Sequence, residues 1–257
     1  MNPSHVFADI RQLHLEILKV SVLQPCRWLK LGWQDMRRHW GASLGYGAIT
    51  VALGWTLLVF CGTHPYYVAA AISGFLLVGP VMAAGLCEMS RRYSLHEPAG
   101  FDDSLDGFAR NKLALTEFGV ALALCAVVWF LLSGLLLGTV FNLGAPDMRE
   151  TLYRGFFDVA NREQVLAYVA IGGILATAVF AVSVVSVPLM IDRHASASQA
   201  MLASLRAVFG NIPAMLVWSA LILLLTLIGL APLLLGMLFV APLLGHATWH
   251  AYRGMVR

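Results

Sequence analysis

Charged residues are scarce in this sequence. Only 12% of the 257 residues are Asp, Glu, Lys or Arg, whereas 59% are apolar. Ordinary soluble domains contain about 25% charged residues, so this chain cannot supply the polar shell that a soluble domain needs. The formal net charge of +3 is also small, and it gives no indication of nucleic-acid binding. The composition therefore predicts an integral membrane protein.

The sequence also lacks the motifs that mark catalytic or redox sites. Its four cysteines include no Cys-x-x-Cys pair and no haem-attachment signature, so we expect unpaired thiols. No Walker loop, dinucleotide-binding glycine fingerprint, kinase motif set or Gly-x-Ser-x-Gly elbow is present. No cleavable signal peptide is expected, because the first long apolar run begins only near Ala42. The sequence predicts neither catalytic residues nor a cofactor.

Six apolar segments are long enough to cross a membrane. A helix needs about twenty apolar residues to span a hydrocarbon core of about 30 Å. After Asn211 no Asp, Glu, Lys or Arg occurs before Arg253, and this stretch can hold two spans with a turn at Gly229–Pro232. We predict an all-α polytopic membrane domain over residues 41–253, after an amphipathic region at 1–40 and before a tail at 254–257. The predicted spans cover residues 41–61, 66–87, 113–141, 165–191, 212–230 and 231–249.

The basic residues predict how these spans are oriented. If the N-terminus is cytoplasmic, all of the 17 lysine and arginine residues except Arg149, Arg154 and Arg162 lie on the cytoplasmic side. Cytoplasmic loops of membrane proteins carry an excess of lysine and arginine. We therefore expect both the N-terminus and the C-terminus in the cytoplasm.

Stretches outside the spans have the apolar spacing of amphipathic helices. The stripe within residues 29–40 combines tryptophans with arginines on other faces, which is typical of a helix in the membrane interface. A stripe in the N-terminal tail would line a short coiled coil or rest against the protein's own cytoplasmic face. The stripes comprise Val6, Ile10, Leu13, Ile17 and Val20; Leu29, Trp33, Met36 and Trp40; Met148, Leu152 and Phe156; and Met201, Leu205 and Val208.

Short segments recur along the chain. They indicate three hairpin-like units of shared orientation, each with an amphipathic lead-in, an outward span and a returning span. Each returning span carries a proline, which frees a carbonyl group and bends its helix. The prolines are Pro80, Pro188 and Pro242. Gly74–Pro80 matches Gly236–Pro242. Separately, Ser104-Leu105 and Asn111-x-x-Ala114 match Ser204-Leu205 and Asn211-x-x-Ala214.

Ionisable residues near the spans gather at the predicted cytoplasmic boundary. In a functional interpretation they line a polar vestibule for an ion, a proton or an anionic headgroup. In a structural interpretation Glu88 pairs with Arg91 and Arg92, at helical spacings of three and four. Glu117, the deepest of these residues, would then pair with a nearby cation. The candidate cluster comprises Glu88, Arg91, Arg92, Glu117 and Asp192.

Two histidines near the end of the sixth predicted span have the spacing of metal ligands. His246 and His250 lie one helical turn apart, which can place both side chains on one helix face. No acid accompanies them as the glutamate does in His-Glu-x-x-His. Beside Trp249 and Tyr252, the pair is also typical of an interfacial anchor. His246 and His250 are candidates for a metal site, but the sequence predicts no bound metal.

Three segments carry a family resemblance. They are Arg27-Trp-Leu-Lys-Leu-Gly-Trp-Gln-Asp35, Ser73-Gly-Phe-Leu-Leu-Val-Gly-Pro80 and Gly85-Leu-Cys-Glu-Met-Ser-Arg-Arg92. These segments resemble the bacterial predicted integral membrane proteins grouped as domain-of-unknown-function family 2189. The resemblance implies a bacterial cytoplasmic (inner) membrane protein, and it implies no catalytic residues because the family has no established activity.

Some members of that family are labelled putative cytochrome c oxidase proteins. The catalytic subunit of an oxidase needs several membrane-embedded histidines to hold its haems and copper. Here only His246 and His250 lie near a predicted span. This excludes the catalytic subunit, whereas an accessory role beside a respiratory complex fits the sequence.

Two classes of function therefore fit the sequence best. The first is a non-catalytic membrane component: an accessory subunit, an assembly factor or a scaffold that contacts the lipid bilayer and another membrane protein. The second is a transporter or channel for a small solute, an ion or a lipid, and an intramembrane enzyme is a third alternative. A polar cavity that reaches the midplane would favour transport. A closed bundle with an exposed apolar ridge would favour the component.

Overall fold

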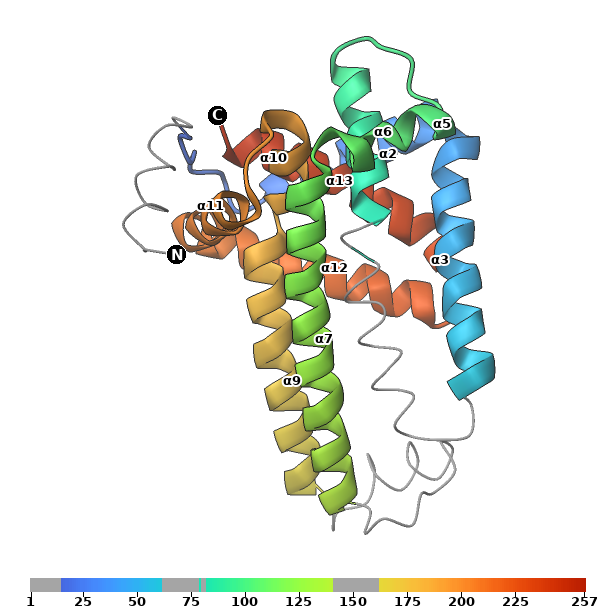
Figure 1. Cartoon of the computed structure of the whole chain (residues 1–257), viewed down its shortest axis with the longest axis vertical. Coiled ribbons are helices and arrows are strands. Elements are labelled where there is room, and N and C mark those ends of the chain that lie inside the picture. The colour runs from blue at the N-terminus through green and yellow to red at the C-terminus, as the bar shows by residue number, and fades with distance from the viewer. Residues whose placement is uncertain (1–14, 62–78, 80–81, 141–161) are drawn as a thin grey trace. The chain divides into compact units, whose positions relative to one another are not determined.

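The computed structural model describes residues 15–61, 79, 82–140 and 162–257. This part of the chain is helical apart from short connections, and its only β-structure is an isolated bridge between Ile17 and Val256. The predicted all-α class is confirmed. The helices (Figure 1) are α2 (Gln24–Arg38), α3 (Trp40–Cys61), α5 (Phe101–Ser104), α6 (Asp106–Arg110), α7 (Lys112–Val140), α9 (Arg162–Ser183), α10 (Ser186–Arg193), α11 (Ala197–Gly210), α12 (Ile212–Leu230) and α13 (Met237–Met255). A further helix covers residues 82–94.

The chain forms two compact units. Unit 1 comprises Met1–Val51, Gly79–Phe118 and Phe180–Arg257, and unit 2 comprises Ala52–Val78 and Gly119–Val179. The helices α3, α7 and α9 each contribute residues to both units.

Unit 2 contains a pair of helices that run side by side, α7 and α9 (Figure 1). The rings of Trp129 and Tyr168 lie 5.1 Å apart. Gly172 leaves room for the tryptophan, since a Cβ at this position would lie 2.8 Å from its ring. The buried Ser133 hydroxyl lies 3.4 Å from the Tyr168 hydroxyl. Aromatic packing against a glycine therefore holds these two helices together.

Three stretches of the described residues are long and apolar enough to cross a membrane. They are Lys112–Leu135, Leu166–Arg193 and Ile212–Leu230, and they correspond to the predicted third, fourth and fifth spans. The helix α3 (Trp40–Cys61) nearly coincides with the predicted first span. The predicted second span, 66–87, lies mostly outside the described residues.

The predicted fourth span is not one continuous helix, because residues 184–185 separate α9 from α10. In an unbroken helix the Val185 N–H would donate to the Ala181 carbonyl. Here the Ser204 hydroxyl of α11 stands between them: it donates to the Ala181 oxygen at 2.7 Å and accepts from the Val185 nitrogen at 3.4 Å. A side chain inserted into the backbone ladder is a known cause of helix breaks.

The predicted sixth span begins later than expected. Residues 231–236 form a turn, and α13 begins only at Met237. Leu233 and Leu234 have φ values of 50° and 69°, which no α-helix contains. The turn is tight, since a Cβ at Gly236 would lie 2.8 Å from the Gly229 Cα. Hydropathy places these leucines in the sixth span, but their backbone geometry excludes them from α13.

The N-terminal tail is extended where the structure describes it. The predicted helical stripe is therefore wrong for its last two members, Ile17 and Val20, while Val6, Ile10 and Leu13 lie outside the described residues. The Leu18 N–H donates to the Met255 carbonyl at 2.8 Å, and the Arg257 N–H donates to the Glu16 carbonyl at 3.0 Å. This antiparallel pairing with the C-terminal end satisfies the backbone groups that a helix would otherwise pair.

Three cap residues join amphipathic segments to the long helices. They are His39 (φ −132°, ψ 68°) after α2, Asn111 (φ −145°, ψ 61°) after α6 and Asn211 (φ −135°, ψ 36°) after α11. Each is followed directly by a long helix, α3, α7 or α12 respectively. The sequence match of Ser104–Ala114 with Ser204–Ala214 is therefore accompanied by a shared backbone conformation.

Each amphipathic segment packs through a small residue against a helix from elsewhere in unit 1. A Cβ at Gly32 of α2 would lie 2.7 Å from the Ala247 nitrogen of α13, and one at Gly107 of α6 would lie 2.7 Å from the Ala84 carbonyl oxygen. Ser204 of α11 reaches the last turn of α9. The segments are thus built into the fold of unit 1, although α2 still exposes Trp33 and the following Trp40.

The helix α11 buries a different face from the one that its large apolar residues predict. Its buried residues are Ala197, Ala200, Ala203, Ser204 and Ala207. The predicted stripe of Met201, Leu205 and Val208 is only partly buried. Close approach to α10 favours the smallest side chains, which a search for large apolar residues overlooks.

Candidate functional site

A buried carboxylate lies at the centre of the candidate site. The helix at residues 82–94 places Glu88 one turn before Arg91 and Arg92, so that all three side chains share a face. Glu88 is fully buried and accepts two hydrogen bonds from Arg91, both at 2.8 Å, and one from Arg92 Nε at 3.1 Å. The hydrogen bonds to Glu88 raise the pKa of the Arg91 guanidinium, which therefore stays charged.

Two further elements complete the surroundings of this carboxylate. Arg110, at the end of α6, lies 3.8 Å from Glu88 and donates from Nε to the Ile191 carbonyl at 3.0 Å. Arg92 Nη1 also lies 3.2 Å from Asp103 of α5, and Nη2 bonds Asp106 of α6. The buried charge of Glu88 is therefore shared among cations that tie together helix 82–94, α6 and α10.

Asp192, at the end of α10, is the centre of a second polar cluster. Its carboxylate accepts a hydrogen bond of 2.6 Å from the Tyr252 hydroxyl of α13, and Arg253 Nη1 lies 3.9 Å away. Through this hydrogen bond Asp192 joins α10 to α13.

A third polar contact connects α2 with α13. His250 Nε2 lies 2.7 Å from the carboxylate of Asp35, which is 4% exposed. Arg38, one turn after Asp35, approaches the same carboxylate at 3.5 Å. Asp35 is thus a buried acid with two basic neighbours.

The other histidine is enclosed by serine hydroxyls. His246 is fully buried, with Nε2 at 3.0 Å from Ser43 Oγ of α3 and Nδ1 at 2.8 Å from Ser90 Oγ. Each ring nitrogen already has a hydrogen-bond partner, so neither points to open space. This chain links α3, α13 and helix 82–94.

The structure brings some of the candidate residues together and leaves others apart. Glu88, Arg91 and Arg92 form one cluster, and Asp192 lies at the neighbouring centre. Glu117 is exposed on α7, and none of the described residues forms an ion pair with it. Thus the pairing expected for Glu117 in the structural interpretation is not found within the described part of the chain.

The candidate metal ligands and prolines are also distributed over separate places. His246 and His250 contact different partners, and among the described residues no three His, Cys, Asp or Glu side chains form a group that could hold a metal ion. Pro242 lies inside α13, and Pro188 lies in α10 just after the helix break. Pro80 lies outside the described residues.

Several members of the network were missed by the sequence reasoning. Tyr252 and the serines carry no charge, and Asp35 lies in a stretch that was predicted to be an interfacial helix. The network residues that were not singled out are Asp35, Ser43, Ser90, Asp103, Asp106, Arg110 and Tyr252. One signal in the sequence could have identified Asp35 as a network residue. It is the only acid of residues 24–38, and the other charged residues of this helix are basic.

One family model matches part of this chain. Residues 68–192 match the family model described as predicted integral membrane protein (DUF2189). That range includes Glu88, Arg91, Arg92 and Asp192, whereas the resembling segment at Arg27–Asp35 lies outside it. A search of curated proteins and a search of solved structures each found no match. The resemblance predicted from the sequence is confirmed: the chain is similar over residues 68–192 to the predicted integral membrane proteins DUF2189, a family of unknown function.

Proposed function

We propose that this protein is a non-catalytic component of a bacterial inner membrane: an accessory subunit, an assembly factor or a scaffold for another membrane protein. The observation that carries the proposal is that the acidic side chains of the site are engaged by other side chains of unit 1. Glu88 is held by arginines, Asp35 by His250 and Arg38, and Asp192 by Tyr252 and Arg253. Removing one partner of a buried ion pair leaves an uncompensated charge, so side chains paired in this way are committed to the packing of unit 1.

This arrangement differs from what transport chemistry needs. A transporter keeps polar groups near the midplane available to its substrate. In unit 1 the buried polar side chains of His246, Ser43 and Ser90 bond one another. The groups that unit 1 presents outward include exposed leucines of α12 and the aromatic side chains of Trp33 and Trp40. Such surfaces suit lipid and protein contacts.

The alternative, a transporter or channel for a small solute, ion or lipid, has one observation in its favour. The α9–α10 segment is a discontinuous helix, and discontinuous spans form the binding sites of many transporters. Next to the break, the buried Ser183 hydroxyl has no hydrogen-bond partner among the described residues. A substrate with a polar group could use this hydroxyl.

We further propose six spans in three hairpins, with both termini in the cytoplasm. The pairing of residues 16–18 with residues 255–257 supports this topology. Two ends that are joined by backbone hydrogen bonds are expected on the same side of a membrane, and six spans, an even number, fit that expectation. Three candidate spans together with α3, the segment at 66–87 and α13 give six.

Purification of the tagged protein from its native membrane in a mild detergent tests the component proposal. Mass spectrometry would quantify each co-purifying protein against the bait, with an unrelated six-span protein from the same membrane as the control bait. We expect a membrane protein, such as a respiratory subunit, near a one-to-one ratio with this bait and absent from the control. Recovery of the bait alone, together with solute flux in liposomes that Ser183→Ala abolishes, would establish the transporter instead.

A further inference from the structure

The outward face of α2 carries cations and no acid. Arg27, Lys30 and Arg37 are exposed, and their spacings of three and seven place them on one side of the helix. The only acid of α2, Asp35, is buried and faces His250 of α13. The outward face is therefore uniformly positive, and no carboxylate on α2 compensates it.

Exposed aromatic rings adjoin these cations. Trp33 and Trp40 are 41% and 40% exposed, and their rings meet edge to face with centroids 6.1 Å apart. The Trp40 ring also lies 5.9 Å from Phe239 of α13, which is 43% exposed. Tryptophan has an apolar body and one N–H donor, and it concentrates at the level of lipid headgroups.

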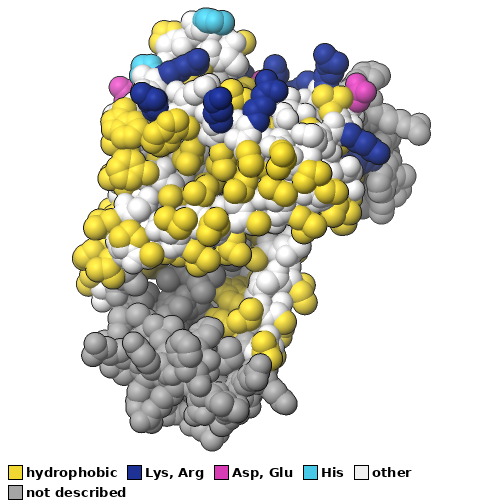
Figure 2. All heavy atoms as spheres, turned by 180° about the vertical axis from the view of Figure 1, so that it is seen from behind, with side chains coloured by type: hydrophobic (Ala, Val, Ile, Leu, Met, Phe, Trp, Pro, Cys, Tyr) yellow, Lys and Arg dark blue, Asp and Glu magenta, His cyan; other side chains and the backbone are white. Residues whose placement is uncertain are grey.

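Unit 1 also exposes aliphatic side chains. Figure 2 shows lysine and arginine side chains in a row along the border of a broad hydrophobic surface. The helix α12, which packs on α2 through an edge-to-face contact of Trp218 with Trp28, exposes leucines on its outer side. These include Leu216, Leu223, Leu224 and Leu227. Unit 1 thus exposes cations, aromatic rings and aliphatic side chains, the three kinds of group that suit the phosphate, ester groups and acyl chains of a phospholipid.

We propose that the outward face of α2 binds anionic phospholipids, with Arg27, Lys30 and Arg37 at the phosphates and Trp33 and Trp40 at the ester groups. Clusters of cations beside a membrane attract anionic lipids, each contributing to the free energy of binding. A zwitterionic headgroup carries its own cation and gains less from this face. An acidic protein segment would match the cations but not the aromatic and aliphatic surface beside them. The inference does not depend on the proposed scaffold role.

A lipid titration of the full-length protein tests the proposal. The protein in a neutral detergent would be titrated with phosphatidylglycerol or with phosphatidylcholine of the same acyl chains. The rise in unfolding temperature gives a Kd for each lipid. We expect tighter binding of phosphatidylglycerol, and a loss of about fivefold for each cation removed, on the order of 100-fold for the triple variant Arg27→Ala, Lys30→Ala and Arg37→Ala. Phosphatidylcholine binding should stay unchanged.

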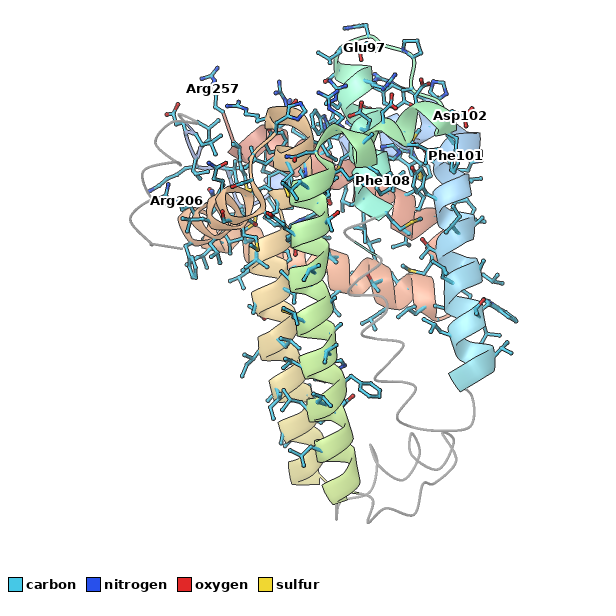
Figure 3. All side chains as sticks on the ribbon, viewed as in Figure 1. Glu97, Phe101, Asp102, Phe108, Arg206 and Arg257 are labelled. Carbon is cyan, nitrogen blue, oxygen red and sulfur yellow. The ribbon has the colours of Figure 1, made fainter. Side chains whose placement is uncertain are left out.

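Three exposed cations elsewhere in unit 1 provide a charge-matched control. Lys112, Arg206 and Arg257 are exposed, and Figure 3 shows Arg206 on α11 and Arg257 at the end of the chain. The triple alanine variant at these positions should keep the preference for phosphatidylglycerol. An equal loss in the control, or no difference between the lipids in the unaltered protein, would overturn the proposal.

A salt titration on the unaltered protein keeps the test valid if the α2 variant does not fold. Exposed charges are screened within about 3 Å at 1 M salt and about 10 Å at 0.1 M. The preference for phosphatidylglycerol should therefore disappear between these concentrations, and its persistence at 1 M salt would contradict headgroup recognition by α2. Tight binding of a polyglutamate peptide without any preference for phosphatidylglycerol would assign the face to an acidic protein and overturn the lipid proposal.

Discussion

At the scale of single residues, Glu88 is the most constrained charge in the described part of the chain. It is fully buried, and Arg91 beside it is 8% exposed. Replacing Glu88 by Gln keeps the volume but leaves the buried Arg91 charge with only the half-exposed Glu97, 3.8 Å away, as a counter-ion. Breaking a buried ion pair in this way costs about 3–5 kcal/mol. We expect Glu88→Gln to lower the unfolding temperature in detergent and to reduce the amount of folded protein in the membrane.

Glu117 provides the matched control for that substitution. It is also a glutamate on a helix of unit 1, but it is exposed and forms no ion pair with the described residues. Glu117→Gln should not lower the unfolding temperature in detergent, since no described cation loses a counter-ion. A large loss with Glu117→Gln, or none with Glu88→Gln, would show that the pairing does not determine stability.

Ser204 is a second residue whose side chain should contribute to the stability of the fold. It bridges the Ala181 carbonyl and the Val185 N–H at the break between α9 and α10. Ser204→Ala would leave both backbone groups without this partner inside the protein, at a cost of about 1–3 kcal/mol. We expect a lower unfolding temperature and faster proteolysis near residues 184–185. Ser219→Ala is the control, because that hydroxyl bonds only the Leu216 carbonyl of its own helix, and a comparable loss there would argue against the bridge.

At the scale of elements, glycines set how closely the helices of unit 1 approach. A Cβ at Gly47 of α3 would overlap the backbone carbonyl of Leu238 in α13, whereas one at Gly41 of the same helix would meet nothing within 4 Å. Backbone atoms cannot rotate away as a side chain can, so Gly47→Ala must push α3 and α13 apart. Overpacking of this kind costs about 1–3 kcal/mol.

The two alanine variants therefore form a matched pair. Gly47→Ala should lower the unfolding temperature measured in detergent, while Gly41→Ala should leave it unchanged or raise it slightly, because alanine favours the helix. If both variants unfold like the unaltered protein, α3 and α13 do not approach as closely as the structure indicates.

Hydropathy predicts the ends of a helix correctly where the helix is as long as its apolar segment. The predicted fifth span agrees with α12 at both ends, Ile212 and Leu230, and the predicted third span differs from α7 by one residue at each end. The exceptions have local physical causes. The positive φ values of Leu233 and Leu234 delay α13, and Ser204 divides the fourth span. Neither effect leaves a trace in hydrophobic periodicity.

The polar network shows the same division between local and distant contacts. Glu88 and Arg91 are neighbours on one helix, so their spacing alone predicts the contact. Asp35 and His250 are separated by 215 residues, and only the packing of α2 on α13 brings them together. The extended tail is similar, because the helical spacing of Ile17 and Val20 is overridden by backbone pairing with the other end of the chain.

At the scale of the whole molecule, the meeting of the two chain ends is the observation with the widest consequence. Backbone bonds join Glu16 to Arg257 and Leu18 to Met255, and the Asn211 side chain receives the Val20 N–H at 2.8 Å and donates to the Leu18 carbonyl at 3.0 Å. Asn211 stands at the start of α12, so the N-terminal segment, the C-terminal end and the entry of a candidate span lie together. The basic bias of the sequence predicts that this side is cytoplasmic.

Reporter fusions test this topology directly. Green fluorescent protein is fluorescent only when it folds in the cytoplasm, and alkaline phosphatase is active only after export. We expect fluorescence from fusions at both termini, and phosphatase activity from an enzyme inserted within residues 141–161, which sequence analysis assigns to an outer loop. A phosphatase inserted next to Glu97, in a segment predicted to be cytoplasmic, should be inactive and serves as the internal control. Fluorescence at one terminus only would require an odd number of crossings, and the pairing of residues 16–18 with 255–257 could then not exist in the membrane.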